Sequence, residues 1–272
     1  IVVKEIKTIC IGNIYVGGTG KTPLSICLSK LLENLNYKTA FIKKKYNDQI
    51  DEQKMLSSRG RLYCENDRIS ALKKAISEKN NIAIFDDGLQ DKNFKYDISF
   101  VCFNAENLIG NGLMLPSGPL RENLKNLKNY DGVFVNGNGE KISEIKNIIQ
   151  NINPNLPIFE TQYVPLNMEK FDKNQNYIAF SGIGNPKSFL KTLKNYNFKI
   201  VENFDFPDHY DYSNQDLIMI KETAKKNNAK IITTEKDYNR LDKSVSNGIE
   251  FLEINLEIFN EKELIKLLNK KL

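Results

Sequence analysis

Tyr15-Val-Gly-Gly-Thr-Gly-Lys-Thr22 is the most informative stretch of this sequence, because it joins three glycines to a lysine and a threonine. It follows an apolar run, Ile6–Gly12, that is typical of a buried strand, and it precedes a helical pattern from about Thr22 to Leu35. Glycines let the backbone curl, so that N–H groups and a helix N-terminus converge on an anion. We therefore predict a phosphate-binding loop between a strand and a helix.

The residues of this stretch have distinct expected roles. Lys21 reaches the β- and γ-phosphates of a nucleotide, and the Thr22 hydroxyl ligates Mg²⁺. The consensus G-x-x-x-x-G-K-[ST] has glycine where Tyr15 stands, and the Gly-Gly pair that follows is typical of variant loops. The remaining residues expected to bind the cofactor are Tyr15, Val16, Gly17, Gly18, Thr19 and Gly20.

A second motif places acidic residues after a buried strand. Ile82–Phe85 is apolar throughout and is followed by Asp86, Asp87 and a glycine. Ligands of open α/β sheets bind at the carboxyl ends of the strands, where an acidic residue holds Mg²⁺ or its water. We therefore predict that Asp86 and Asp87 lie at the metal site.

Three further segments are less specific. His209 is the only histidine, which excludes a His-rich zinc site, and between Asp208 and Asp211 it is either structural or catalytic. Asp51 and its neighbour Glu52 are typical of a solvated acidic loop. Pro116–Glu122 predicts a rigid loop whose arginine suits a phosphate.

The length and pattern predict two α/β domains. A chain of 272 residues corresponds to about two domains, and short apolar strands alternate with helical stretches in both halves. We expect a P-loop NTPase-like α/β/α sandwich with a mostly parallel sheet over 1–157, an extended β linker over 158–170, and a smaller α/β/α domain over 171–272 that closes the cleft. The expected strands lie at 6–12, 39–42, 82–85, 98–103, 132–135, 177–181, 198–204, 230–234 and 250–253; the expected helices lie at 22–35, 67–78, 186–196, 214–226 and 261–271.

Composition narrows the partners. The net charge is +5 at pH 7 with interspersed signs, so we expect anionic ligands and no nucleic acid. No window approaches the ~18 apolar residues of a membrane span. The four cysteines form no C-x-x-C pair, and we expect reduced, mostly buried thiols.

Six motifs in order resemble the tetraacyldisaccharide 4′-kinase (lipid A 4′-kinase) family. They are Gly12–Pro23, Asp86-Asp-Gly-Leu-Gln90, Gly118–Glu122, Ser181–Pro186, Asp208-His209 and Thr233–Asp237. The resemblance implies ATP- and Mg²⁺-dependent phosphorylation of the 4′-hydroxyl of an acylated disaccharide 1-phosphate. It also implies a peripheral enzyme at the cytoplasmic face of the bacterial inner membrane, and we expect a monomer.

The resemblance assigns roles by position. Asp51 and His209 together activate the acceptor hydroxyl, whereas Gln90, Arg121 and Glu122 lie near the transferred phosphate or the substrate. The chain departs from the family at Lys43–Asn47, at Ile50 and at Asp91. Lys43 to Lys45 are either an anionic-lipid contact or a solvated run.

Two other functions stay open at this point. One is a P-loop ATPase switch that binds a protein partner, and the other is a weakened homologue that only binds the lipid. Stimulation of ATP turnover by an acylated sugar distinguishes the kinase from the switch.

Overall fold

The computed structural model describes residues 4–46, 49–106, 108–137 and 140–272. Asn47, the last residue of the Lys43–Asn47 segment that departs from the family, therefore lies outside the described residues. Contacts divide the chain into two compact units. Unit 1 comprises Ile1–Lys45, Leu56–Tyr163 and Leu256–Leu272; unit 2 comprises Tyr46–Met55 and Val164–Asn255.

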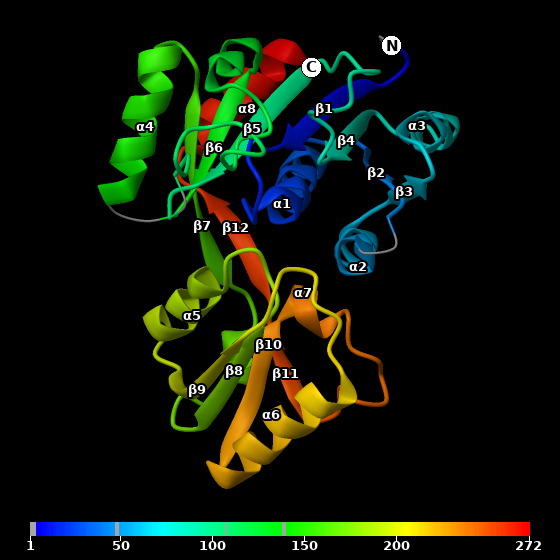
Figure 1. The fold of residues 1–272 in the computed structure, drawn as a ribbon. Coiled ribbons are helices and arrows are strands. Elements are labelled where there is room, and N and C mark those ends of the chain that lie inside the picture. The colour runs from blue at the N-terminus through cyan, green and yellow to red at the C-terminus, as the bar shows by residue number, and fades with distance from the viewer. Residues whose placement is uncertain (1–3, 47–48, 107, 138–139) are drawn as a thin grey trace. The chain divides into compact units, whose positions relative to one another are not determined.

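Unit 1 is built on a mostly parallel sheet of eight strands among the described residues, ordered β12-β7-β6-β5-β1-β4-β2-β3 (Figure 1). The strands are β1 (Lys7–Gly12), β2 (Thr39–Lys44), β3 (Leu62–Glu65), β4 (Ile82–Asp86), β5 (Ile98–Asn104), β6 (Gly132–Asn136), β7 (Ile158–Pro165) and β12 (Ile254–Ile258). The helices are α1 (Lys21–Asn34), α3 (Arg68–Ser77), η2 (Leu124–Asn129), α4 (Glu140–Ile152) and α8 (Glu261–Lys271), with α2 (Ile50–Arg59) divided between the units.

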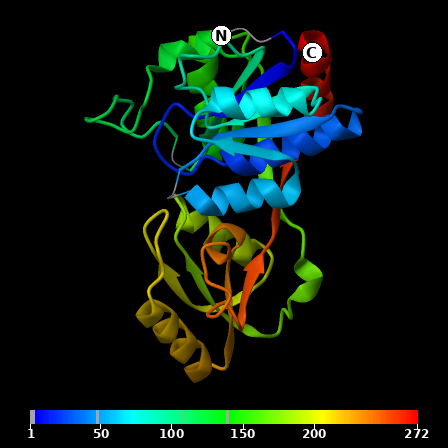
Figure 2. The same cartoon turned by 90° about the vertical axis from the view of Figure 1, so that its right-hand side faces the viewer.

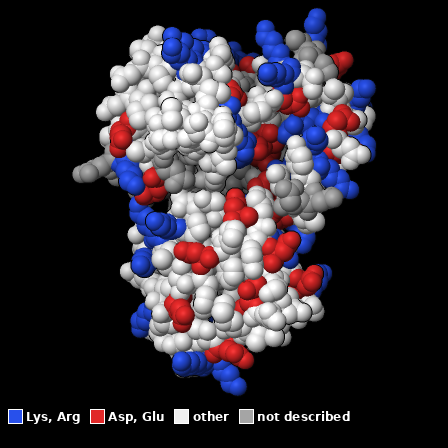
Figure 3. All heavy atoms as spheres, in the orientation of Figure 1, with Lys and Arg blue, Asp and Glu red and all other residues white. Residues whose placement is uncertain are grey.

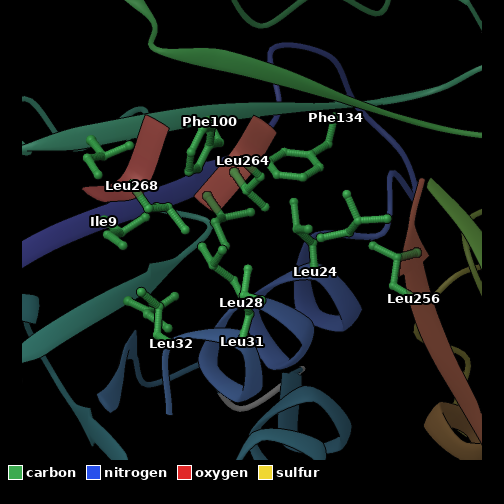
Figure 4. Close-up of a cluster of buried hydrophobic side chains, with 14 of the residues drawn as sticks. Ile9, Leu24, Leu28, Leu31, Leu32, Phe100, Phe134, Leu256, Leu264 and Leu268 are labelled. Carbon is green, nitrogen blue, oxygen red and sulfur yellow. The ribbon is translucent and has the colours of Figure 1, made fainter. Parts of the chain in front are cut away.

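Helices cover both faces of this sheet because its central strands are apolar on both sides. Ile9 and Ile11 of β1 pack in a cluster with α1 and α8, whereas Cys10 between them packs in a cluster with α3. Successive strand residues point to opposite faces, so one apolar run supplies two cores. Figure 4 shows the first cluster, with Leu24 and Leu28 of α1 near Ile9 and Phe100.

Unit 2 contains a smaller parallel sheet of four strands among its described residues, ordered β11-β10-β8-β9. Its elements are η3 (Met168–Lys170), β8 (Asn176–Ser181), α5 (Pro186–Asn195), β9 (Lys199–Asp205), α6 (Asn214–Lys226), β10 (Ala229–Thr234), α7 (Glu235–Tyr238) and β11 (Ile249–Leu252). Helices α5 and α6 pack on opposite faces, since Tyr177 and Ala179 contribute to one cluster and Ile178 and Phe180 to the other.

These two parallel sheets with their helices confirm the predicted α/β class. The segment expected as a linker instead begins with β7, which pairs with β6 in the sheet of unit 1. The last residues, from Leu256 on, group with unit 1 rather than with the second domain, because β12 adds to the first sheet and α8 packs on it.

Two expectations from composition have structural counterparts. None of the helices in the described part of the chain is long and apolar enough to cross a membrane. The four cysteines are free; Cys10 and Cys102 are buried, whereas Cys27 and Cys64 are partly exposed. Lys, Arg, Asp and Glu side chains are interspersed on the face in Figure 3.

Candidate active site

The loop between β1 and α1 has the backbone of a phosphate cradle. Gly17 and Gly20 have φ angles of 124° and 85°, a region that other residues rarely adopt. Helix α1 begins at Lys21 directly after the loop, and no side chain caps its N-terminus. Its first N–H groups therefore remain available to an anion.

Close packing also requires a glycine at position 20. A Cβ there would lie 2.6 Å from the hydroxyl oxygen of Tyr163 and 3.5 Å from the amide nitrogen of Asn136. Tyr163 is the last residue of unit 1 on β7, and burial raises the pKa of its phenol. Asn136 and Tyr163 thus pack against the loop at Gly20. The sequence analysis did not identify them.

The start of the loop is occupied by structural contacts. The Tyr15 ring packs in the core, and its hydroxyl oxygen accepts a hydrogen bond of 2.6 Å from the N–H of Asn104. The Val16 N–H donates to the carbonyl of Pro119. The Tyr15 side chain thus anchors the start of the loop to the end of β5.

Asp86, at the end of β4, is held by three donors. The hydroxyls of Thr22 and Ser25 donate to its carboxylate at 3.1 Å each, and Lys43 Nζ lies 2.7 Å from its Oδ2. Lys43 projects from β2, which pairs with β4, and its side chain is 2% exposed. The proposed lipid contact is therefore wrong for Lys43, because its ammonium is buried against Asp86.

Asp87 has a different environment although it is the next residue. Its Oδ1 lies 3.8 Å from Lys21 Nζ and 3.5 Å from an Arg121 nitrogen, yet this buried oxygen accepts no hydrogen bond. Arg68 donates to the carbonyl of Asp87 and to the carboxylate of Asp91. Asp91, where the family has a histidine, thus helps to fix the Asp87 turn.

The donor set around Thr22 fits a magnesium ion. Mg²⁺ prefers carboxylate and hydroxyl oxygens, and Thr22, Asp86 and Asp87 present such oxygens at one strand end. The unpartnered Oδ1 of Asp87 is an orphaned buried acceptor that a cation satisfies. No group of three or more His, Cys, Asp or Glu side chains that could hold a metal is present among the described residues. Mg²⁺ is commonly bound by one or two carboxylates together with substrate phosphates.

The loops after β4 and before η2 meet beside this site. Gln90 donates to the carbonyl of Asn13 and to the Glu122 carboxylate. Arg121 Nη1 lies 3.5 Å from the Gln90 amide oxygen, and the Arg121 N–H donates to the carbonyl of Ile14. The structure therefore places Gln90 and Glu122 beside Arg121, whose guanidinium lies near Asp87.

Unit 2 contains a separate cluster of charged residues. Asp51 lies in the first turn of α2 and is 1% exposed, so the expectation of a solvated acidic loop is wrong. Its Oδ2 accepts a bond of 2.6 Å from Arg240 Nη2, and its Oδ1 lies 3.9 Å from His209 Nδ1. The structure thus brings Asp51 and His209 together, and Arg240 is a participant that sequence reasoning missed.

The rest of this cluster balances the charge. Lys236 Nζ lies 3.3 Å from Asp208, 3.5 Å from Glu52 and 3.4 Å from His209 Nε2. Asp237 is fully buried and accepts hydrogen bonds from the Gly182 N–H and from a tyrosine hydroxyl. Burial raises the pKa of Asp237, and its hydrogen bonds give this carboxylate a structural role.

A strand–loop–helix cradle with an amine, a hydroxyl and two carboxylates beside it is typical of P-loop proteins that bind nucleotide phosphates. The sequence model of the tetraacyldisaccharide-1-P 4′-kinase family matches residues 2–272. This chain belongs to that family of kinases.

Individual relatives agree. The chain is 55% identical over 266 residues to the tetraacyldisaccharide 4′-kinase of Pelagibacter ubique, covering 98% of this chain and 85% of the relative. It is 38% identical over 285 residues to that of Rickettsia canadensis, covering 98% and 84%. The crystal structure of an "apo" form of LpxK from Aquifex aeolicus in complex with ATP matches with a TM-score of 0.71 and 23% identity, covering 99% of this chain and 89% of that one. The kinase interpretation is thus supported over the ATPase switch.

Proposed function

We propose that this chain transfers the γ-phosphoryl group of ATP to the 4′-hydroxyl of a tetraacyldisaccharide 1-phosphate, with Mg²⁺ as cofactor. The observation that carries the proposal is the convergence of Lys21 and Arg121 on Asp87, whose Oδ1 is buried without a hydrogen bond. A bound phosphate would pair with the two cationic side chains, and a bound cation would contact the unpartnered carboxylate oxygen.

Unit 1 supplies the donor half of the reaction. The loop amides and the N-terminus of α1 bind the phosphates, and Lys21 and Arg121 neutralise charge on the transferred group. Thr22, Asp86 and Asp87 would hold Mg²⁺, which neutralises phosphate charge when bound. Gln90 and Glu122 keep Arg121 beside Asp87.

Unit 2 supplies the acceptor half. His209 is the only imidazole of the chain and acts as the general base for the 4′-hydroxyl. Asp51 is buried beside it and stabilises the imidazolium that forms on proton transfer. General-base catalysis of this kind contributes about 10²–10⁴-fold.

We also propose that the enzyme is a monomer that binds peripherally to the cytoplasmic face of the inner membrane. Three consecutive large apolar side chains, Leu113, Met114 and Leu115, are 47–55% exposed, and Val16 of the cradle is 49% exposed. The segment that carries them projects from unit 1 (Figure 2). An acylated substrate resides in a bilayer, and exposed apolar side chains can enter its interface.

The test of the central proposal follows a label. ATP labelled in its γ-phosphate is incubated with Mg²⁺ and a tetraacyldisaccharide 1-phosphate in detergent, and the lipid is separated from inorganic phosphate. We expect labelled lipid, and none with an acceptor that already carries a 4′-phosphate. Label found only in inorganic phosphate would contradict transfer and favour a switch ATPase; nucleotide binding without turnover would indicate a homologue that only binds the lipid.

A further inference from the structure

Arg240 lies between the two residues assigned to proton transfer. Its Nη2 is 2.6 Å from Asp51 Oδ2 and 3.1 Å from His209 Nδ1. Its Nη1 donates to the Gly182 carbonyl at 3.0 Å and lies 3.4 Å from Asp237. The side chain is 8% exposed, so the guanidinium is buried, with both Nη1 and Nη2 in contact with polar partners.

The contact with the guanidinium bears on which ring nitrogen of His209 carries the proton. Arginine has donors only, so the 3.1 Å contact between Nη2 and Nδ1 is a hydrogen bond only when Nδ1 accepts. Lys236 also has donors only, but its Nζ lies farther, 3.4 Å, from Nε2. A neutral imidazole that accepts at Nδ1 carries its proton on Nε2. In this arrangement His209 has no lone pair on Nε2 with which to take a proton from an alcohol.

Asp51 presents a hydrogen-bond acceptor, rather than a donor, to the same Nδ1 atom. Arg240 occupies Oδ2, whereas Oδ1 is buried, accepts no hydrogen bond and lies 3.9 Å from Nδ1. That distance is about 1 Å longer than an N–H···O bond. A small rotation of the ring therefore exchanges a donor at Nδ1 for a carboxylate acceptor.

The geometry points to Arg240 as a positioning residue that sets the tautomer of His209. It orients Asp51 so that Oδ1 remains reserved for Nδ1, and it holds the resting ring with the proton on Nε2. When the proton instead resides on Nδ1 and is donated to Asp51 Oδ1, the Nε2 lone pair becomes available to the acceptor hydroxyl. The ring's one proton moves between the nitrogens through water, so the exchange leaves the charge unchanged. The catalytic consequence rests on the proposed function, since it takes His209 as the base.

Other charged groups face the ring and belong to the same equilibrium. Lys236 Nζ lies 3.4 Å from Nε2 and favours an accepting Nε2, whereas Asp208, 3.9 Å from Nε2, favours a protonated one. Glu52 lies against Lys236, and Asp237 against Arg240. Lys236 Nζ also lies 3.7 Å from Asp51 Oδ2. Arg240 differs from it because its bond to Asp51 is shorter, 2.6 Å, and because it faces Nδ1 rather than Nε2.

Because the chain has one histidine, ring nitrogen NMR reports this tautomer without assignment. In ¹⁵N-histidine-labelled full-length protein near neutral pH, we expect Nδ1 at the shift of a bare ring nitrogen and Nε2 at that of an N–H. Arg240→Met should move Nδ1 to the protonated position, because Asp51 becomes its only close partner. Arg61→Met, an exposed arginine of unit 1, is the matched control and should leave both signals in place.

A wild-type ring protonated on Nδ1, or an Arg240→Met spectrum identical to wild type in a folded protein, would overturn the proposal. If the Met variant fails to fold, the wild-type spectrum still decides. Arg240→Lys keeps a cation beside Asp51 but loses the two-sided guanidinium contact that orients this carboxylate toward Nδ1. It should therefore lower kcat roughly tenfold with KM for ATP unchanged. His209→Ala with unchanged turnover would remove the base role and leave the NMR result standing, so the two failures are distinguishable.

Discussion

Nζ of Lys43 lies 2.7 Å from Oδ2 of Asp86, and the two side chains are 2% and 0% exposed. This buried ion pair fixes the carboxylate that closes the phosphate site, between adjacent strands β2 and β4. It also explains how a lysine is tolerated at position 43, where the chain departs from the family: its charge is matched within the sheet. Much of the site in unit 1 depends on such internal pairing.

Removing one member of this pair should destabilise unit 1. Lys43→Met leaves Asp86 buried with only hydroxyl donors, and breaking a buried pair costs about 3–5 kcal/mol. We expect a lower urea midpoint, whereas Lys45→Met, an exposed neighbour, should unfold like wild type. Equal midpoints for both variants would show that the pair contributes nothing.

Lys21→Ala should impair transfer because it removes a fixed cation beside Asp87. Loss of one charge-stabilising donor typically costs about 10²–10³ in turnover. Lys30→Ala changes an exposed lysine on the same helix and serves as the control. Steady-state transfer rates measure the difference, and near-wild-type rates for Lys21→Ala would refute the phosphate-loop assignment.

Gly20→Ala should combine backbone strain with a steric clash. A residue at φ 85° costs about 1–2 kcal/mol, and the added Cβ would also meet the Tyr163 hydroxyl at 2.6 Å. Gly248→Ala separates the two effects, because φ is 79° there and nothing lies within 4 Å. Unfolding free energies should show the larger loss at Gly20, part of which Tyr163→Phe restores. An equal loss at both glycines would exclude the clash.

Replacing Leu113, Met114 and Leu115 together with serine should weaken membrane binding. Each large apolar side chain contributes about 1.5–3 kcal/mol when buried, so we expect at least about tenfold less protein on liposomes of anionic and zwitterionic phospholipid. Ile218 and Met219 on α6 are 55% and 42% exposed, and their serine variant is the control. Equal sedimentation of the two variants would remove this segment as the contact.

Features of unit 1 that depend on neighbouring residues were predictable from sequence. The strand, glycine loop and helix around Lys21 follow one another directly, so the local pattern predicts the loop itself. Asn136 and Tyr163, which pack against it, lie far along the chain. Likewise, β4 is apolar up to the aspartates at its end. Most strands and helices of unit 2 were also predicted to within a few residues, since apolar strands alternate there with amphipathic helices.

Features that depend on distant partners were not predictable. In α2, Ile50 is 52% exposed whereas Asp51 is buried, which reverses the usual pattern. Asp51 is buried because it pairs with Arg240, and that partner lies 189 positions further along the chain. Lys43 is buried for the same reason, with its partner 43 positions further on. The elements α2, β3, α4, α7 and β12 were missed, and β12 is recognisable only once β7 is present to pair with it.

The most direct test of the account measures His209→Ala and wild type side by side, in transfer of γ-labelled phosphate to the acylated disaccharide and in ATP affinity. The account predicts that turnover falls about 10²–10⁴-fold while the affinity for ATP is unchanged, because His209 serves only the acceptor. Turnover equal to wild type would contradict the assignment of the acceptor chemistry to Asp51 and His209.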